Sequence, residues 1–320
     1  MPKNNKSGTA FPFSKNGMDF YKEYNCDLCG STNAVEIPHV RDYTNGQVIH
    51  ICRKCGLIYV KCRRSSDRVA EVWSNELFAK RYTSKSPLMF ARHNYVAEFI
   101  DQSLGLKNKK VCDVGAGEGQ FLKIIKNNYK VRTFGIEPSR NNCRLMKKEN
   151  LKAFNGTLQN FIEERNHKKN LFDIVTMLWS IENSTSPKEL LLGARKIMRD
   201  NGYLVIATGS RILVPFSKPL YLYLSTNPAD THPVRFSVNT LIAFLETCGF
   251  RAVRINPFLN DNLLLCVIAK KEKLPVDVRV KGNNFRKVKD FFERWHKETR
   301  KYYPAREYRL IKNYAWLKSF

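Results

Sequence analysis

The sequence predicts an α/β protein with a doubly wound, largely parallel β-sheet. An apolar stretch beginning at residue 109 ends at Asp113 and leads into glycines at positions 115, 117 and 119, as expected where a buried strand turns sharply into a helix. A second short strand ends at Glu137, one strand–helix–strand spacing later. Strand and helix patterns then alternate as far as residue 209, and this repeated order is typical of a doubly wound sheet.

The individual elements follow from apolar spacing and from turn residues. Phe90, Val96 and Phe99 recur at helical intervals, so residues 89–104 are expected to form a helix that covers the sheet. Asn201-Gly202 predicts a turn before the fifth strand. The other expected elements are strands at 109–115, 132–137, 153–156, 172–180 and 202–209, helices at 119–128, 139–149 and 187–199, and a final antiparallel pair at 250–257 and 263–270.

The glycine turn favours one class of nucleotide cofactor over another. A dinucleotide usually requires GxGxxG, with its pyrophosphate at the helix N-terminus, but the third of these positions is Gln120 here. The carboxyl groups of Asp113 and Glu118 flank the turn and would repel a pyrophosphate. S-adenosylmethionine carries an ammonium and a sulfonium group and no phosphate, so the same acids would attract it. On the residues alone, an ordinary glycine-rich turn without a ligand stays open as the alternative.

Two motifs, DVGAGEG beginning at Asp113 and IEP around Glu137, resemble the class I S-adenosylmethionine-dependent methyltransferases. The resemblance covers residues 107–271 and implies a Rossmann-like, seven-stranded methyltransferase sheet with S-adenosylmethionine as cofactor. The residues that it implies for cofactor binding are Asp113, which orients the loop, Gly115 and Gly117, which lie against the methionine part, and Glu137, which holds the ribose. Gly119, the last glycine of the turn, is also expected to belong to the cofactor site.

Residues after the third and fourth strands are expected to complete the cofactor site. Leu158 is expected to pack on the adenine ring, and Gln159 offers both a donor and an acceptor to the edge of that ring. The alternative for these two residues is the start of a helix with no ligand contact. Ligands of such sheets bind beyond the carboxyl ends of the strands, so Trp179, which follows the fourth strand, is also expected to line the site.

Four of the nine cysteines predict a zinc site. Cys26 and Cys29 form one CxxCG knuckle, and Cys52 and Cys55 form a second one 22 residues further on. Two such knuckles complete a tetrahedral thiolate site, so the zinc ion is expected to be structural, with no open coordination position. A disulfide framework and a redox dithiol are the weaker alternatives, because the first suits an oxidising compartment and the second does not require two copies.

Composition limits the location and the partners. The chain has 320 residues, of which 43% are hydrophobic, and a formal net charge of +26. It contains no apolar run near the ~20 residues of a membrane span and no apolar signal region at the N-terminus, so a cytoplasmic protein is expected. The charge favours an anionic partner, for which nucleic acid, a nucleotide-linked substrate, an acidic glycan and a membrane surface all stay open, as does the oligomeric state.

The expected organisation has five parts. They are a disordered N-terminus (1–20), a zinc ribbon (21–65), a helical linker and cap (66–106, with a helical segment at 73–82), the methyltransferase domain (107–271, with a lid insertion at 211–237) and a basic, aromatic C-terminal extension (272–320). In the extension, Phe285, Val288, Phe292 and Trp295 recur at helical spacing. This stripe either packs a terminal helix onto the protein or forms a stacking platform for nucleic acid.

A zinc ribbon before this domain resembles the zinc-ribbon methyltransferases of sugar, surface-glycan and natural-product pathways. The segment Thr231–Ser237, followed by an expected amphipathic helix from Thr240 to Phe250, is similar to a further block of that family. The resemblance implies a small-molecule or glycan acceptor, anionic in view of the charge of the chain, and a role in polysaccharide biosynthesis.

Three residues are candidates for the base that removes a proton from the acceptor. Relatives often carry Glu-His after the fourth strand, where this chain has Glu182 and Asn183, so another histidine is needed. His232 in the lid insertion is the first choice, since histidine titrates near neutral pH. Glu182 and Tyr221 follow it. The alternative for His232 is that it caps the next helix.

The motifs also separate the reaction classes. The Asn- or Asp-Pro-Pro-aromatic motif of base N-methyltransferases is missing after the fourth strand, and no proline precedes a cysteine, as cytosine C5 enzymes require. Only about fifty residues follow the last strand, which disfavours sugar C-methyltransferases with their large C-terminal domain. O-methylation of a sugar, nucleotide sugar or surface glycan is therefore the first interpretation. An RNA methyltransferase and a non-catalytic zinc-ribbon protein that binds nucleic acid are the alternatives.

Overall fold

The computed structural model describes residues 21–44, 48–64, 87–164, 171–209, 211–216, 218–226, 232–258, 264–275 and 280–302. The N-terminus expected to be disordered (1–20), the expected helical segment at 73–82 and the end of the C-terminal extension lie outside these residues.

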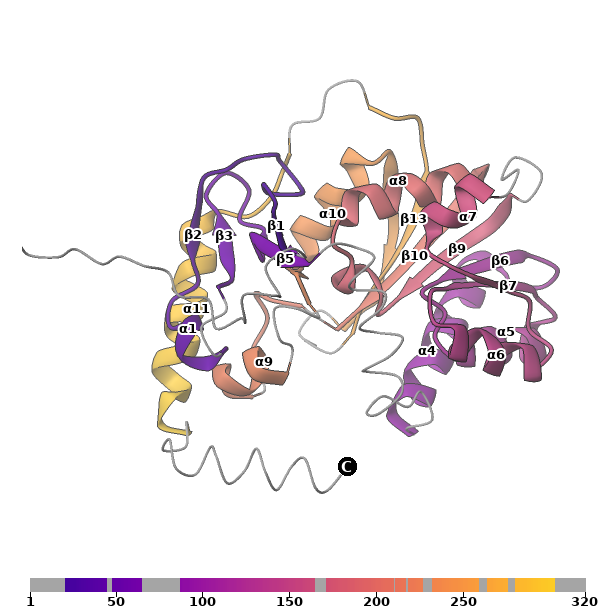
Figure 1. Cartoon of the computed structure of the whole chain (residues 1–320), viewed down its shortest axis with the longest axis horizontal. Coiled ribbons are helices and arrows are strands. Elements are labelled where there is room, and N and C mark those ends of the chain that lie inside the picture. The colour runs from indigo at the N-terminus through magenta and orange to yellow at the C-terminus, as the bar shows by residue number, and fades with distance from the viewer. Residues whose placement is uncertain are drawn as a thin grey trace, which may run out of the picture.

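A seven-stranded sheet forms the centre of the larger part of the molecule and confirms the predicted fold class (Figure 1). The first five strands along the chain run parallel, whereas β13 runs antiparallel to both of its neighbours. From one edge to the other, the strands are β8 (Ala153–Asn155), β7 (Arg132–Glu137), β6 (Lys110–Val114), β9 (Phe172–Leu178), β10 (Met198–Thr208), β13 (Leu265–Lys271) and β12 (Phe250–Ile255).

Alternating side chains of the strands feed two separate cores. Cys112 and Val175 belong to the core under one helical layer, whereas Val111 and Ile174, the preceding residues, belong to the core under the other layer. Figure 1 shows the helices on both sides of the sheet. One layer contains α4 (Pro87–Leu104), α5 (Gln120–Tyr129) and α6 (Arg140–Lys148), and the other contains α7 (Leu158–Glu164), α8 (Pro187–Ile197) and α10 (Val238–Thr247).

The structure departs from the sequence-based expectations at two places in this domain. Residues 158–164 form a helix, α7, which the sequence had indicated only as an alternative at its first residues. Asn201 and Gly202 lie within strand β10, and the strand register shifts between Met198 and Tyr203. The expected turn is therefore an irregularity in a long strand that begins directly after α8.

The ribbon sheet is completed by a strand from the insertion after β10. Its strands β2 (Ala34–Glu36), β3 (His50–Cys52) and β4 (Ile58–Tyr59) are antiparallel, and β11 (Val234–Arg235) pairs with β4 at the edge. A separate pair joins β1 (Tyr21–Glu23) to β5 (Cys62–Arg64). The ribbon is thus joined through backbone hydrogen bonds to the segment that follows the fifth strand of the large sheet.

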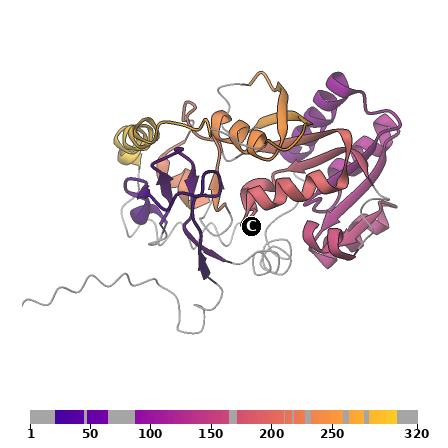
Figure 2. The ribbon, with the colours of Figure 1, turned by 90° about the horizontal axis from the view of Figure 1, so that it is seen from above.

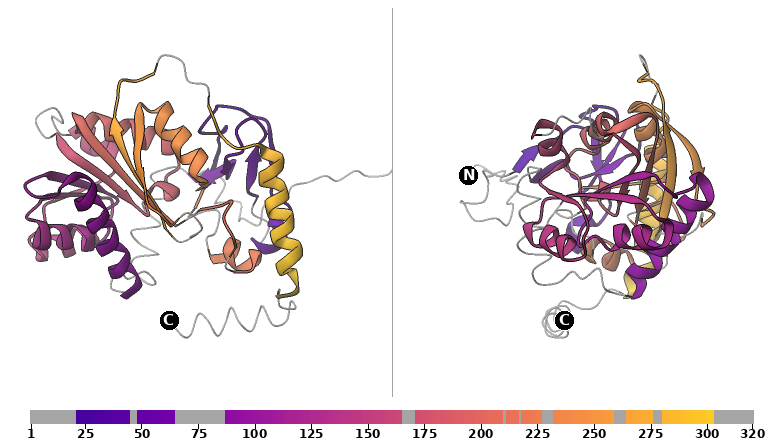
Figure 3. Two further views of the ribbon diagram at one scale, coloured as in Figure 1. Left: turned by 180° about the vertical axis from the view of Figure 1, so that it is seen from behind. Right: turned by 90° about the vertical axis from the view of Figure 1, so that its right-hand side faces the viewer.

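The C-terminal helix α11 (Phe285–Thr299) packs against the ribbon and against α9 (Leu220–Thr226). Figures 2 and 3 show α11, in yellow, beside the ribbon in indigo. Val288, Phe292 and Trp295 are buried in a core that they share with ribbon and insertion residues. The Trp295 indole N–H also donates to the Lys218 carbonyl oxygen at 2.8 Å. The aromatic stripe therefore holds the helix to its own chain, and these buried rings are not available as a stacking platform.

Candidate functional site

A cavity of about 750 Å³ opens at the carboxyl ends of β6, β7 and β9. The carboxyl ends of parallel strands lie along one edge of a sheet, which brings together residues that are far apart in the sequence. Of the expected cofactor-binding residues, those that line the cavity are Asp113, Gly115, Gly117, Glu137, Leu158, Gln159 and Trp179. Helix α4 adds Met89 and His93 to the lining, and α8 adds Glu189 and Lys196.

All three glycines of the turn have positive φ, and at two of them a side chain would also meet a close neighbour. Gly115 has φ +79°, and a Cβ there would lie 2.8 Å from Cβ of Ser180. Gly119 also has φ +79°, but its missing side chain leaves room for Met146 of α6. Gly119 is absent from the described lining of the cavity, so its place in the structure is that of a packing residue at the start of α5.

Two buried acids, Asp113 and Glu137, lie next to this turn. Oε2 of Glu137 accepts the backbone N–H of Gly117 at 2.9 Å, and Oε1 accepts the backbone N–H of Ser139, also at 2.9 Å. Oδ1 of Asp113 accepts the hydroxyl of Thr176 at 2.6 Å. Burial raises the pKa of Asp113 to about 7, and it also raises the pKa of Glu137, against the opposing effect of the two backbone donors.

The balance of charge in the cavity is opposite to that of the whole chain. Its described lining contains four carboxylic acids, which are Asp113, Glu118, Glu137 and Glu189, and one lysine, Lys196. The chain as a whole has a formal charge of +26. A cationic ligand without phosphate groups fits such a lining, whereas a pyrophosphate would face carboxylates on both sides of the turn.

The residues expected near adenine begin helix α7. Leu158 is buried and packs closely against α8, because a Cβ at Gly193 would lie 2.9 Å from Cδ2 of Leu158. The Gln159 side-chain amide donates to Oε1 of Glu163 at 2.6 Å, on the exposed side of the helix. Both residues line the cavity, so a helix start and a ligand contact are compatible here rather than alternatives.

Trp179 adopts an unusual backbone conformation at the end of β9. Its φ of +53° is rare for a residue with a side chain, and its carbonyl oxygen accepts the side-chain amide of Asn183 at 2.9 Å. The indole nitrogen is buried without a hydrogen-bond partner among the described residues. A buried donor of this kind beside a cavity is a fitting contact for a polar group of a ligand.

The three candidate bases lie outside the described lining of the cavity. Glu182 is 1% exposed and accepts the backbone N–H of Gly209 at 3.3 Å; burial raises its pKa to about 7. Burial, together with the charges of Arg235 and Lys218, lowers the pKa of His232 to about 3. Tyr221 packs beside the ring of Tyr43, at 6.3 Å between centroids, in the core between ribbon and insertion.

His232 does not cap the helix that follows, which differs from the alternative that the sequence allows. The N-cap of α10 is Ser237, whose hydroxyl accepts the backbone N–H of Thr240 in a reciprocal capping box. The backbone carbonyl of His232 accepts a hydrogen bond from Arg235 at 3.0 Å.

His93 and Gln120 also line the cavity, although the sequence analysis assigned neither of them a role in a site. Nδ1 of His93 lies 2.8 Å from Oε1 of Gln120, and the His93 ring meets the Trp179 ring edge-on at 5.4 Å between centroids. His93 is one position in an amphipathic helix, and nothing local distinguishes a core histidine from one that lines a cavity. The pairing of α4 with α5 is needed to see it.

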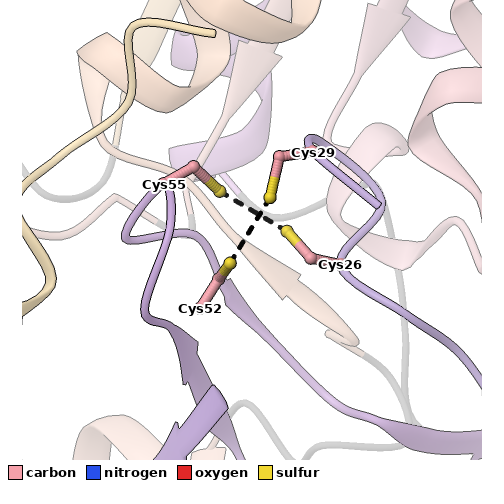
Figure 4. A group of neighbouring side chains, drawn as sticks. All are labelled: Cys26, Cys29, Cys52 and Cys55. Atoms are coloured by element: carbon pink, nitrogen blue, oxygen red, sulfur yellow. Dashed lines mark hydrogen bonds between the residues drawn. The ribbon is translucent and has the colours of Figure 1, made fainter. Parts of the chain in front are cut away.

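The four knuckle cysteines converge on one point, as Figure 4 shows. Their sulfur atoms all lie within 4.8 Å of one another, with 3.4 Å between Cys26 and Cys55 and 3.5 Å between Cys29 and Cys52. These distances are far longer than a disulfide bond of ~2.05 Å and match sulfurs that share one ion. The group is suited to structural zinc, held by residues that leave no ligand position to water.

The second knuckle is also held from outside the ribbon. The backbone N–H of Asn283 donates to the carbonyl oxygen of Cys55 at 2.8 Å, and the Asn283 side-chain amide donates to the Ser237 hydroxyl at 2.7 Å. A Cβ at Gly282 would overlap the carbonyl oxygen of Cys55. The start of the C-terminal extension therefore connects the zinc knuckle to the helix cap of the large domain.

Comparison with known proteins gives one family match. A family model described as a methyltransferase domain matches residues 90–255. No curated protein matches the chain.

The fold is similar to several solved structures. A SAM-dependent methyltransferase from Thermotoga maritima is 17% identical, with 64% of this chain and 100% of that chain covered and a TM-score of 0.46. Magnesium protoporphyrin IX methyltransferase from Synechocystis PCC 6803 with bound SAH is 11% identical, with coverages of 65% and 100% and a TM-score of 0.49. A SAM-dependent methyltransferase from Archaeoglobus fulgidus is 19% identical, with coverages of 56% and 94% and a TM-score of 0.44.

Proposed function

The chain belongs to the methyltransferase-domain family, as a class I S-adenosylmethionine-dependent enzyme, and from this premise we propose that it methylates a hydroxyl group of a sugar, a nucleotide sugar or a surface glycan. The observation that supports this acceptor class is the pairing of β11 with β4. Both strands come from segments that resemble the sugar and glycan group, the ribbon and the block that begins at Thr231. Their contact places the ribbon beside the insertion that follows the fifth strand.

The cavity has the features that S-adenosylmethionine requires. Its acidic lining suits the ammonium and sulfonium charges, and its volume of about 750 Å³ lies within the usual range for a ligand site, ~300–1,000 Å³. When bound, the cofactor supplies an activated methyl group on a positively charged sulfur. Glu137 would hold the ribose hydroxyls, the turn at Gly115 and Gly117 would lie against the methionine part, and Leu158 would pack on the adenine ring.

The protein's part in this reaction is mainly to hold the acceptor oxygen in line with the methyl group and to exclude water. Correct positioning of two reactants contributes ~7–11 kcal/mol to rate enhancement in favourable cases. A hydroxyl acceptor also requires a base for its proton, which a thiol or an amine acceptor needs less. The charge of +26 fits an acceptor that carries phosphate or carboxylate groups, such as a nucleotide sugar.

The state of the thiols supports a cytoplasmic reaction. None of the nine cysteines forms a disulfide, and seven of them are buried. Cysteines without disulfides and a thiolate metal site suit a reducing compartment such as the cytoplasm. Among the helices that the structure describes, none combines the length and the apolarity that a membrane span demands.

The acceptor can be identified by mass spectrometry of cells with and without the gene. We expect the nucleotide-sugar or surface-glycan fraction to lose one methyl group per modified unit when the gene is deleted. The methyl group should return with the wild-type chain and not with Glu137→Ala. Unchanged sugars and a lost methyl group in digested RNA would replace the proposal by the RNA methyltransferase, which the basic charge of the chain also favours.

Calorimetry distinguishes the proposed enzyme from a non-catalytic scaffold that binds nucleic acid. The scaffold would bind nucleic acid without binding S-adenosylmethionine, whereas we expect micromolar binding of the cofactor to the full chain. A nucleic-acid scaffold binds phosphates through cationic surfaces, so it would not require the four acids of the cavity lining.

A further inference from the structure

We propose that His93 is the base that takes the proton from the acceptor hydroxyl. The proposal rests on the proposed function, because it assigns a residue to hydroxyl methylation at the same cavity. Helix α4 carries His93 into the cavity wall, where 9% of the residue is exposed. Helix α4 precedes the whole glycine-turn motif in the sequence, so the residue joins the site only through tertiary packing.

Gln120 determines which nitrogen of His93 carries the proton. Nδ1 of His93 lies 2.8 Å from Oε1 of Gln120. A carbonyl oxygen can only accept a hydrogen bond, so the orientation with Oε1 of Gln120 facing the ring assigns the donor role to Nδ1. In the neutral ring, Nε2 then keeps its lone pair and is the nitrogen that can accept a proton.

Two aromatic contacts fix the plane of the His93 ring. The ring meets Trp179 edge-on at 5.4 Å between centroids and lies 6.2 Å from the ring of Phe121. Trp179 directly follows β9, whereas Gln120 and Phe121 begin α5. The imidazole is therefore held between the start of α5 and the residue that follows β9, and a catalytic base needs this kind of fixed orientation.

The surroundings keep the imidazole neutral and able to accept a proton. Burial and the neighbouring charge of Arg92 lower the pKa of His93, whereas the hydrogen bond to Gln120 opposes this. Arg92 lies on the same helix, with its guanidinium 5.9 Å from the centroid of Trp179. The carboxyl groups of the described cavity lining are Asp113, Glu118, Glu137 and Glu189.

The step balances without any further reactant. The acceptor oxygen forms a bond to the methyl carbon while the carbon–sulfur bond breaks and its electron pair stays on sulfur. The hydroxyl proton passes to Nε2 of His93 and from there to water. His93 fits this step better than His232 or Glu182, because those two lie outside the described lining of the cavity.

Variants of the full-length chain can test the assignment. His93→Asn keeps an N–H donor near the position of Nδ1 and removes the base. His39→Asn is the matched control, since His39 lies at the start of α1, on the side of the ribbon that packs against α11, with about half of its side chain exposed. The acceptor probe is the nucleotide-sugar and glycan extract of cells that lack the gene, and the donor is S-adenosylmethionine with a tritiated methyl group.

We expect His93→Asn to transfer methyl groups at least ~100-fold more slowly than the wild type, since a general base contributes ~10²–10⁴-fold. Binding of S-adenosylmethionine and S-adenosylhomocysteine by calorimetry should change by less than about threefold, and His39→Asn should behave like the wild type. An unchanged rate would overturn the assignment. A parallel loss of cofactor binding would also overturn it, because His93 would then be a cofactor anchor.

A measurement without acceptor separates this proposal from the proposed function. In ¹⁵N spectra of the histidine rings, the signal missing from His93→Asn should show a protonated Nδ1 and an unprotonated Nε2 at pH 7, and should shift on addition of S-adenosylmethionine. A protonated Nε2, or no shift, contradicts the role of His93 whatever the acceptor is. Correct spectra together with no methyl transfer to the extract would instead contradict the acceptor class.

Discussion

The carboxylate of Glu137 accepts a hydrogen bond from the backbone N–H of Gly117, with 2.9 Å between Oε2 and the nitrogen. The last residue of β7 thereby fixes the conformation of the turn that follows β6, the neighbouring strand in the sheet. Oε1 is held by the backbone N–H of Ser139. One acid thus shapes the glycine turn and also lies where ribose hydroxyls are expected.

We predict that Glu137→Ala weakens S-adenosylmethionine binding by about 10- to 100-fold. Hydrogen bonds to a charged group contribute ~1.5–3 kcal/mol, and ~1.4 kcal/mol corresponds to a factor of ten in affinity. Calorimetric titration measures the change. Glu149→Ala is the control, because Glu149 is exposed at the end of α6 and pairs with Lys123 at 2.7 Å. Equal affinities of Glu137→Ala and the wild type would remove Glu137 from the cofactor site.

The fold was predictable to the extent that its signals are local. The glycine turn, the acid that ends β7 and the alternation of strands and helices are each visible within ten or so residues, and the seven-stranded sheet follows from them. The two cysteine knuckles are equally local, and their four sulfurs meet as expected.

Features that depend on distant contacts were not predictable in the same way. His93 and Gln120 are 27 positions apart and belong to two helices that each look like ordinary amphipathic elements. The two-residue strand β11 becomes a strand only because β4 lies beside it. A short segment without periodicity carries no strand signal of its own, so its role in the ribbon emerges from the packing.

Asp113 predicts a pH dependence of cofactor binding. Burial raises its pKa to about 7, so below this pH the carboxyl group is mostly neutral. A cationic ligand favours the ionised form, lowers that pKa and releases a proton on binding. Affinity for S-adenosylmethionine should therefore rise as the pH increases from about 6 to about 7.5, by up to tenfold per pH unit below the pKa.

Calorimetry at several pH values, in buffers of different ionisation enthalpy, measures both the affinity and the number of protons released. Asp113→Asn should bind more weakly and should show a much flatter pH profile. The burial of Glu137 raises its pKa as well and acts in the same direction, so a small residual slope is expected in the variant. An affinity that falls with rising pH would contradict the ionisation of Asp113 on binding.

Removal of zinc should destabilise the chain well beyond the ribbon. The knuckle at Cys55 is bonded to Asn283, and the ribbon sheet includes β11. We expect Cys52→Ser to abolish bound zinc and to lower Tm by 10 °C or more, since structural zinc contributes several kcal/mol and ~1 kcal/mol shifts Tm by a few degrees. Elemental analysis and calorimetric melting check both effects.

Cys62→Ser is the matched control for the zinc prediction. Cys62 lies in β5 of the same part of the chain and outside the four-sulfur group. It should retain one zinc per chain and melt close to the wild type. Zinc retained in Cys52→Ser at full stoichiometry would show that the ion binds elsewhere.

Glu182 should make the folded chain less stable as the pH rises above 4.5, the ordinary pKa of a glutamate side chain. Burial raises its pKa from 4.5 to about 7, with the backbone N–H of Gly209 as an opposing donor. Between these two values the folded chain keeps a proton that the unfolded chain has lost, so this contribution to the free energy of unfolding falls as pH rises and then levels off above 7. The loss is on the order of 3 kcal/mol, at ~1.4 kcal/mol per pH unit.

Glu182→Gln should therefore raise Tm at pH 8 by several degrees and reduce the fall in stability between pH 4.5 and 7, because glutamine still accepts the Gly209 N–H without carrying a charge. Glu246→Gln, an exposed position on α10, controls for the loss of a negative charge. Melting scans at pH 4.5, 7 and 8 measure the difference in Tm between each variant and the wild type.

The Glu182→Gln variant also tests Glu182 as a base. Methyl transfer at the wild-type rate, together with the gain in Tm, would assign Glu182 a structural role only. A 100-fold slower rate with unchanged cofactor affinity would instead assign it a role in the reaction.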